Sequence, residues 1–135
     1  MTSPTDCWPT LSAHDPRALI AFLVDAFGFV ELAVHGDGDG VHHAELATPG
    51  GRGGVMLGSA RENVTRGVAA PGSASAYVVV ADVDALFARA TAAGAQVVEA
   101  PFDTDYGSRD CALRDPEGGT WFFGTYPGTA QPPGT

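Results

Sequence analysis

The sequence contains no lysine, and all seven of its basic residues are arginine. Asp and Glu together number 16, which gives the chain a net charge of −9. A surface of this sign repels a phosphate backbone and an anionic bilayer, so the charge argues against nucleic-acid and membrane partners. The same surface attracts a cationic small molecule, although acidity alone also serves to keep a small protein soluble.

Long hydrophobic runs are also missing. No apolar run approaches the roughly 18 residues that span a bilayer. The N-terminus, MTSPTDCWPT, has neither the basic nor the apolar region of a signal peptide, so we expect a cytoplasmic protein. Cysteine is scarce: Cys7 and Cys111 form no C-x-x-C pair, and we expect two free thiols.

Apolar residues make up 44% of the 135-residue chain, which is enough for one compact domain with a core. The chain repeats itself within that length. A predicted helix begins at Asp15 and Pro16 and ends at Gly28, and a second begins at Asp82 and ends at Gly94. The helix-ending glycines lie 66 residues apart, and so do Gly58 and Gly124 at the ends of predicted strands. This spacing predicts a duplicated β-α-β-β-β unit.

The repeat sets the domain boundaries. We predict a first module at 7–59, a connecting loop at 60–73, a second module at 74–126 and a flexible tail at 127–135. The predicted strands are 7–13, 29–35, 41–48, 53–59, 75–81, 95–102, 108–115 and 119–126.

Alternation along these strands places side chains on opposite faces. His43 and Glu45 share one face of their strand, whereas Trp121 and Phe123 share a face that Phe122 opposes. Neither strand has one wholly polar side, which predicts that both sheet faces are covered. One face would meet the helices, and the other would meet a ligand or a second subunit.

Three segments resemble the glyoxalase/bleomycin-resistance superfamily, also called vicinal oxygen chelate proteins, in a branch poor in metal ligands. They are WPTLSAHDPRALIAFLVDAFGF (8–29), HAELATPGGRGGVMLGS (43–59) and YGSRDCALRDPEGGTWFFGTY (106–126). The resemblance implies an α+β fold in which two β-α-β-β-β modules form a cupped eight-stranded mixed sheet with the helices outside. It also implies a small molecule inside the cup and a homodimer, swapped or unswapped.

Metal-using members of this superfamily hold the ion at four places on the strands. Here those places fall near Trp8, near Met56 or Leu57, near Ser75 and near Phe122, and only the Ser75 hydroxyl is even a weak ligand. We therefore expect no metal and no cofactor. The alternative is a site built on His43 and Glu45, joined by His35 or His42.

The last strand offers aromatic side chains where a metalloenzyme needs an acid. Flat aromatic surface suits stacking on a conjugated ligand and attracts cations, although these residues could equally fill the core. Arg109 could hold an acidic group of a ligand or could pair with Asp103, Asp105 or Asp110. The predicted ligand-binding residues are Trp8, His43, Glu45, Met56, Tyr77, Tyr106, Arg109, Trp121 and Phe123.

We predict a metal-independent protein that binds a small molecule. The most concrete form of this function is the sequestration of a planar or cationic toxic natural product such as a bleomycin-like glycopeptide. An enzyme is the less favoured interpretation. Two alternatives stay open: a metal-dependent lyase, isomerase or dioxygenase of the same superfamily, and a metal-free enzyme in which Glu45 or His43 is the general base.

Overall fold

A computed structural model describes residues 7–63 and 66–128 of the chain. Both long helices begin and end as the sequence predicts. The Asp15 carboxylate accepts a hydrogen bond from the backbone N–H of Ala18, and Pro16 opens helix α1. Helix α1 ends at Gly28, whose φ of 74° lies in the left-handed region that favours glycine. The Asp82 carboxylate caps helix α3 in the same way.

Eight strands and three helices follow one another in the order of a repeated β-α-β-β-β unit. The short helix α2 lies inside the segment predicted as a loop. The elements are β1 (Thr10–Ala13), α1 (Pro16–Phe27), β2 (Val30–His35), β3 (His43–Ala47), β4 (Gly54–Ser59), α2 (Ala60–Asn63), β5 (Ser75–Val79), α3 (Val83–Ala92), β6 (Gln96–Asp103), β7 (Arg109–Arg114) and β8 (Thr120–Gly124).

The strands form two four-stranded mixed sheets of identical topology, which confirms the duplication. Sheet A has the order β1-β4-β3-β2, and sheet B has the order β5-β8-β7-β6. In each sheet the first strand pairs in parallel with the last strand of its module, and the other pairs are antiparallel. A single chain therefore holds the two predicted β-α-β-β-β modules of an α+β fold, each with a four-stranded mixed sheet.

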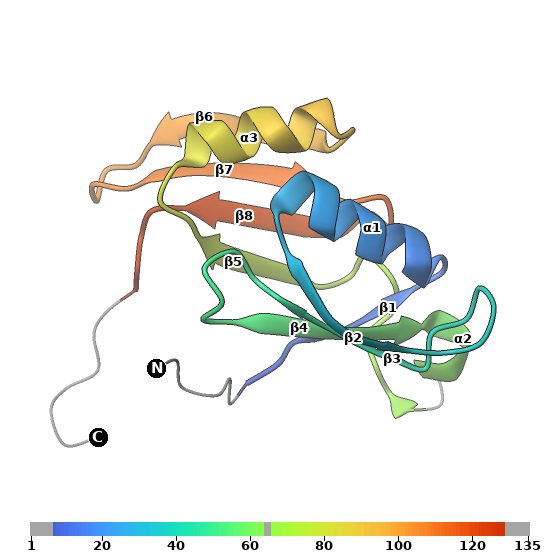
Figure 1. The fold of residues 1–135 in the computed structure, drawn as a ribbon. Helices are drawn as coiled ribbons and strands as arrows, with labels where there is room; N and C mark the ends of the chain where they lie inside the picture. Colours follow the sequence, from blue (N-terminus) through green and yellow to red (C-terminus); the bar gives the residue numbers. More distant parts are fainter. Residues whose placement is uncertain (1–6, 64–65, 129–135) are drawn as a thin grey trace, which may run out of the picture.

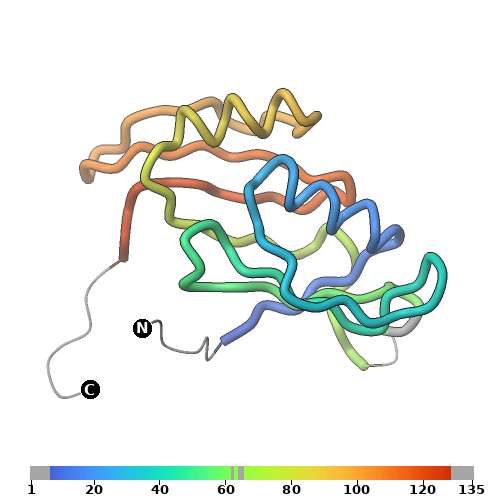
Figure 2. The backbone as a smooth tube through the Cα atoms, in the orientation of Figure 1, coloured from blue at the N-terminus to red at the C-terminus, as the bar shows by residue number. Residues whose placement is uncertain are grey.

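Helices α1 and α3 pack against each other on the same side of the two sheets (Figure 1). Phe27 near the end of α1 contacts Phe123 and Trp121 of sheet B, with ring centroids 4.7 Å and 5.8 Å apart. Leu19 and Leu23 of α1 join the same core as Leu57 of sheet A. Both long helices thus lie on one side of the two sheets and share one hydrophobic core with them. The backbone trace shows α1 lying alongside both sheets (Figure 2).

Polar contacts also join the two modules. The Glu117 carboxylate, from the turn before β8, accepts hydrogen bonds from the backbone N–H groups of His14 and Asp15, at 2.8 Å and 2.9 Å. The Arg89 guanidinium of α3 donates to the backbone oxygens of Asp25 and Val24 at the end of α1. The modules are therefore tied at both ends of α1.

Within the described part of the chain, no helix is long and apolar enough to cross a membrane. The predicted flexible tail falls largely on residues 129–135, which lie outside the described residues.

Candidate functional site

Each sheet has an inner face against the helices and an opposite face, which we call the open face. On sheet B the inner face carries Cys111, Leu113, Trp121 and Phe123, all buried. The open face carries side chains that no helix of the described chain covers. Its exposed large apolar residues are Tyr77, Val79, Phe102 and Phe122, each between 37% and 40% exposed. The open faces of sheets A and B are the candidate functional surfaces.

The open face of sheet A brings together four of the predicted ligand-binding residues. Glu45 lies directly opposite Met56 in the β3–β4 pairing. The His43 imidazole Nε2 lies 2.8 Å from the Glu45 carboxylate, and both side chains are partly exposed. The Trp8 indole lies over Gly54, where any side chain would overlap the ring. This face therefore combines a flat aromatic surface with a carboxylate and an imidazole.

His35 extends this polar group. It is the cross-strand neighbour of His43, and the two imidazole rings are stacked with centroids 6.4 Å apart. Among the described residues, however, no group of three or more His, Cys, Asp or Glu side chains could hold a metal ion. Met56 and Phe122 occupy matching places on the two sheets, and neither side chain is a ligand for a hard divalent cation. The donor set thus does not fit the ion that metal-using members of the superfamily hold.

The open face of sheet B has Tyr77 and Phe122 side by side in the β5–β8 pairing. The Tyr77 hydroxyl donates to the Asp110 carboxylate at 2.9 Å and accepts a hydrogen bond from the backbone N–H of Tyr126. Partial burial and the hydrogen bond to Asp110 raise the pKa of Tyr77 to about 12. Tyr77 therefore stays protonated at physiological pH and presents a neutral aromatic ring beside Phe122.

Tyr106 lies close to Tyr77, because its hydroxyl donates to the same Asp110 carboxylate at 3.5 Å, whereas Arg109 points away from the ring pair. The Tyr106 side chain is exposed and makes an edge-on contact with the Tyr126 ring, with centroids 5.5 Å apart. Arg109 points to the helix side of β7, where its guanidinium bonds both oxygens of Asp84, at 2.9 Å and 3.0 Å, and one oxygen of Asp103, at 3.1 Å. These bonds raise the pKa of Arg109 and lower that of Asp84. Of the two roles open for Arg109 from the sequence, its contacts match the ion pair.

Trp121 and Phe123 lie on the inner face and belong to the hydrophobic core. Phe123 is 0% exposed and Trp121 is 3% exposed. The Trp121 indole N–H donates to the Asp115 carboxylate at 2.7 Å, and that carboxylate also accepts the backbone N–H groups of Glu117 and Gly119. Their placement matches the core-filling role that the sequence left open, whereas Phe122, which was not among the predicted ligand-binding residues, lies on the open face.

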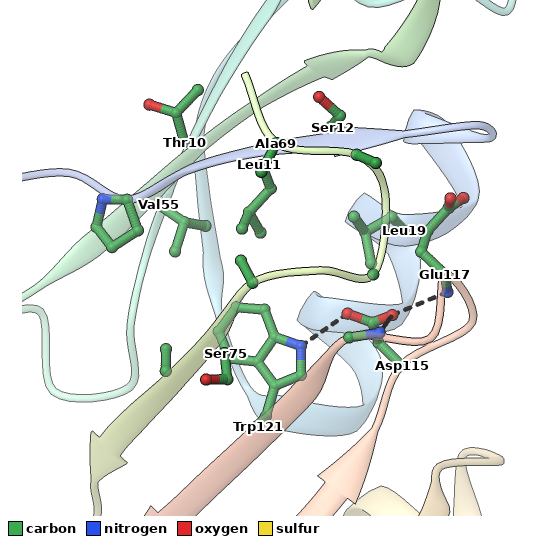
Figure 3. A pocket seen from close by; sticks show the side chains of 16 residues that line it. Thr10, Leu11, Ser12, Leu19, Val55, Ala69, Ser75, Asp115, Glu117 and Trp121 are labelled. Atoms are coloured by element: carbon green, nitrogen blue, oxygen red, sulfur yellow. Dashed lines mark hydrogen bonds between the residues drawn. The ribbon is translucent and has the colours of Figure 1, made fainter. Parts of the chain in front are cut away.

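A small cavity lies where β1 and β5 approach each other, and Figure 3 shows it lined by Leu11, Val55 and Leu19 on one side and the Trp121 ring on the other. Its volume is about 30 Å³. A buried water needs roughly 10–15 Å³ by this measure, so the cavity is too small for an aromatic ligand. A shallower groove of about 300 Å³ runs between α1 and β2, beside Arg17 and Glu31, and contains none of the predicted ligand-binding residues.

The fold and these faces are those of the Glyoxalase/Bleomycin resistance protein/Dioxygenase superfamily, whose sequence profile matches residues 8–123; the chain belongs to this superfamily. Among its relatives is an uncharacterized protein of Mycobacterium bovis, 35% identical over 127 residues, which cover 86% of this chain and 82% of that protein.

Solved structures of the same fold include TioX from Micromonospora sp. ML1, with a TM-score of 0.74 and 32% identity over 94% of this chain and all of that one. TnmS3, an antibiotic binding protein from Streptomyces sp. CB03234, superposes with a TM-score of 0.71 at 23% identity, covering 91% of this chain and 96% of that chain.

Sequence reasoning missed two residues of the open face of sheet B, Phe122 and Arg114. The segment CALRD held a partial signal: Cys111 and Leu113, the larger apolar residues of β7, share one face of the strand, and Arg114 lies on the other face with the small Ala112. The β7–β8 pairing then sets Phe122 on the side of Arg114 and Trp121 on the side of Leu113.

Proposed function

We propose that this protein binds a planar, partly aromatic small molecule without a metal, between the open face of sheet A of one chain and the open face of sheet B of a second chain. Trp8, Met56 and the His43–Glu45 pair would form one wall. Tyr77 and Phe122 of the other chain would form the opposite wall. Enclosure of the compound, with no chemical change, would sequester it.

The observation that carries the proposal is the row of apolar side chains on the open face of sheet B. Tyr77 and Val79 on β5, Phe122 on the neighbouring β8 and Phe102 on the edge strand β6 share this face and are only partly covered. An exposed apolar patch of this kind marks a surface that meets a ligand or another protein. The described chain cannot cover it, because both of its long helices lie on the inner faces.

The second chain follows from the same geometry. The cavity described between the two sheets has a volume of about 30 Å³. A site for a small organic ligand generally measures about 300–1,000 Å³. Pairing an open face of sheet A with an open face of sheet B from another chain would provide walls for such a site and would cover both apolar surfaces.

The class of ligand is supported by the chemistry of the walls and by the net charge of −9. Flat rings of Trp, Tyr and Phe stack on conjugated compounds and attract cations. The fold likeness to TnmS3, an antibiotic binding protein, supports a toxic natural product as the compound.

Native mass spectrometry of the protein purified from its own host tests the proposal, because it reports subunit number, metal and bound compound together. We expect a dimer that carries an organic compound and no stoichiometric metal. Phe122→Ala should weaken binding of that compound about five- to tenfold, the equivalent of one lost aromatic contact. Val97→Ala is the matched control, because Val97 is 47% exposed but pairs with Leu113 on the inner side of sheet B. A stoichiometric metal held through His43 and Glu45 would contradict the proposal.

One contact favours a second candidate, a metal-free enzyme. The 2.8 Å contact between His43 and Glu45 is the arrangement of a general base and the group that orients it. Incubation of the isolated compound with the protein separates the two functions: a product that disappears with Glu45→Gln identifies the enzyme, whereas unchanged compound identifies the binder.

A further inference from the structure

The open face of sheet B carries the Arg114 guanidinium, a charged group to which the described residues offer no partner. No hydrogen bond or ion pair joins it to another described residue, and its Nε atom is buried without a hydrogen-bond acceptor. A buried polar atom left unpaired costs free energy, so such an atom calls for an explanation. Arg109 is, in contrast, held by two carboxylates.

The position of Arg114 places it beside the aromatic wall. It pairs with Thr120 at the end of β7, and Thr120 lies two residues before Phe122 on β8. Side chains two residues apart on a strand point to the same face, so Arg114, Thr120 and Phe122 share the open face. Arg114 itself is only partly exposed, which keeps its guanidinium close to the sheet.

We infer that Arg114 is an anion-binding residue of the proposed site and that the ligand carries an acidic group, such as a carboxylate or an acidic phenol, next to its planar part. This inference rests on the proposed function. Burial of Nε limits the rotation of the guanidinium, and the two terminal nitrogens then form a fork that matches the two oxygens of a carboxylate. The aromatic rings of Tyr77 and Phe122 would bind the flat part of the same compound.

The net charge of the protein restricts how many acidic groups the ligand can carry. A compound with several negative charges would be repelled by a protein of net charge −9. The fitting compound has one acidic group on a planar framework that is otherwise neutral or cationic. On the other wall, Glu45 and His43 can pair with a cationic or hydrogen-bonding group, so an amphoteric aromatic compound satisfies both faces.

A matched pair of fluorescent probes tests this inference: 2-anthracenecarboxylate and its neutral analogue 2-anthracenecarboxamide, titrated into the full-length protein. We expect the wild-type protein to bind the carboxylate more tightly by a factor on the order of ten, the range of a charge-assisted hydrogen bond. Arg114→Gln should abolish that preference while leaving the affinity for the carboxamide within about twofold. Arg114→Lys should retain part of it, because the charge stays and the fork is lost.

Arg52→Gln is the control, since it removes the same charge from the exposed turn between β3 and β4 and should leave the preference intact. Far-UV circular dichroism of each variant checks that it is folded, and Arg114→Lys provides the answer if Arg114→Gln is not.

Three outcomes would overturn the inference. If the wild-type protein binds both probes equally, or if Arg114→Gln keeps the preference, Arg114 does not bind the acidic group, while the proposed function stands. If Arg114→Gln instead dissociates the dimer and leaves the preference unchanged, Arg114 pairs with a carboxylate of the second chain. If the wild-type protein binds neither probe, the binding of planar compounds fails, and this inference fails with it.

Discussion

Two neighbouring phenylalanines on β8 should respond very differently to truncation, because they point to opposite faces of sheet B. Phe123 is 0% exposed and contacts Phe27 of α1. Phe123→Ala removes a fully buried ring and leaves a cavity, which costs about 3–5 kcal/mol. Phe122 is 40% exposed. A phenylalanine ring buries roughly 150–250 Å² when fully enclosed, and Phe122 buries a little over half of that area. At about 25 cal/mol per Å², losing this buried area costs about 2 kcal/mol or somewhat more. The alanine side chain regains part of this free energy, and no cavity is left behind.

Urea unfolding followed by far-UV circular dichroism, at one fixed protein concentration, measures both costs. The free energy of unfolding should fall about 1–3 kcal/mol further for Phe123→Ala than for Phe122→Ala. The ligand affinity should show the reverse order, with Phe122→Ala the more damaging among folded variants. Equal costs for the two variants, or a larger cost for Phe122→Ala, would show that the inner and open faces of sheet B have been assigned the wrong way round.

Three other predictions concern single groups. A double-mutant cycle of Asp115→Ala and Trp121→Phe should give a coupling of about 1.5–3 kcal/mol in unfolding experiments, because the indole donates to a buried carboxylate; a coupling near zero would contradict the bond. Burial raises the pKa of the Cys111 thiol to about 11. At pH 8 only about one thousandth of Cys111 is thiolate, so Ellman's reagent should label the exposed thiol quickly and Cys111 only in denaturant. The ion pair with Arg109 lowers the pKa of Asp84, so its stabilising effect is present above the unfolded carboxyl pKa and is lost as pH falls through the folded value. Wild-type protein and Arg109→Gln should therefore converge in stability toward pH 3 and differ most near pH 7, and a difference independent of pH would exclude this pair as its source.

Local sequence signals predicted the elements well. The caps at Asp15 and Asp82 and the glycine that ends α1 each act through neighbours within a few residues, so no tertiary information is needed to recognise them. The repeat spacing predicted the matching topology of the two sheets for the same reason, since each module carries its own order of elements.

The arrangement of the modules could not be predicted in this way. Whether α1 and α3 lie outside a shared sheet or pack together depends on contacts such as Phe27 with Phe123, which are 96 residues apart in the chain. The faces of β8 illustrate the same difficulty. Alternation separates Phe122 from Trp121 and Phe123, but only the docking of the helices decides which of the two sides is the core.

The candidate site shows both successes and failures of sequence reasoning. His43, Glu45 and Met56 lie together on the open face of sheet A because strand pairing brings β3 and β4 into register. Arg109 was chosen for its position after a turn, yet its side chain faces α3, where Asp84 is available. Asp84 lies 25 residues before Arg109, and nothing in the local sequence of either residue indicates the other.

The hydrogen bonds from the backbone of His14 and Asp15 to Glu117 have a consequence for how the chain folds during synthesis. The amides that open α1 are made within the first tenth or so of the chain, whereas the carboxylate that accepts from them is added near the end. While the ribosome is still producing the second module, these amides can donate their hydrogen bonds only to water. The first module therefore completes its docking only when the turn that carries Glu117 has emerged, so the two halves reach their final form together.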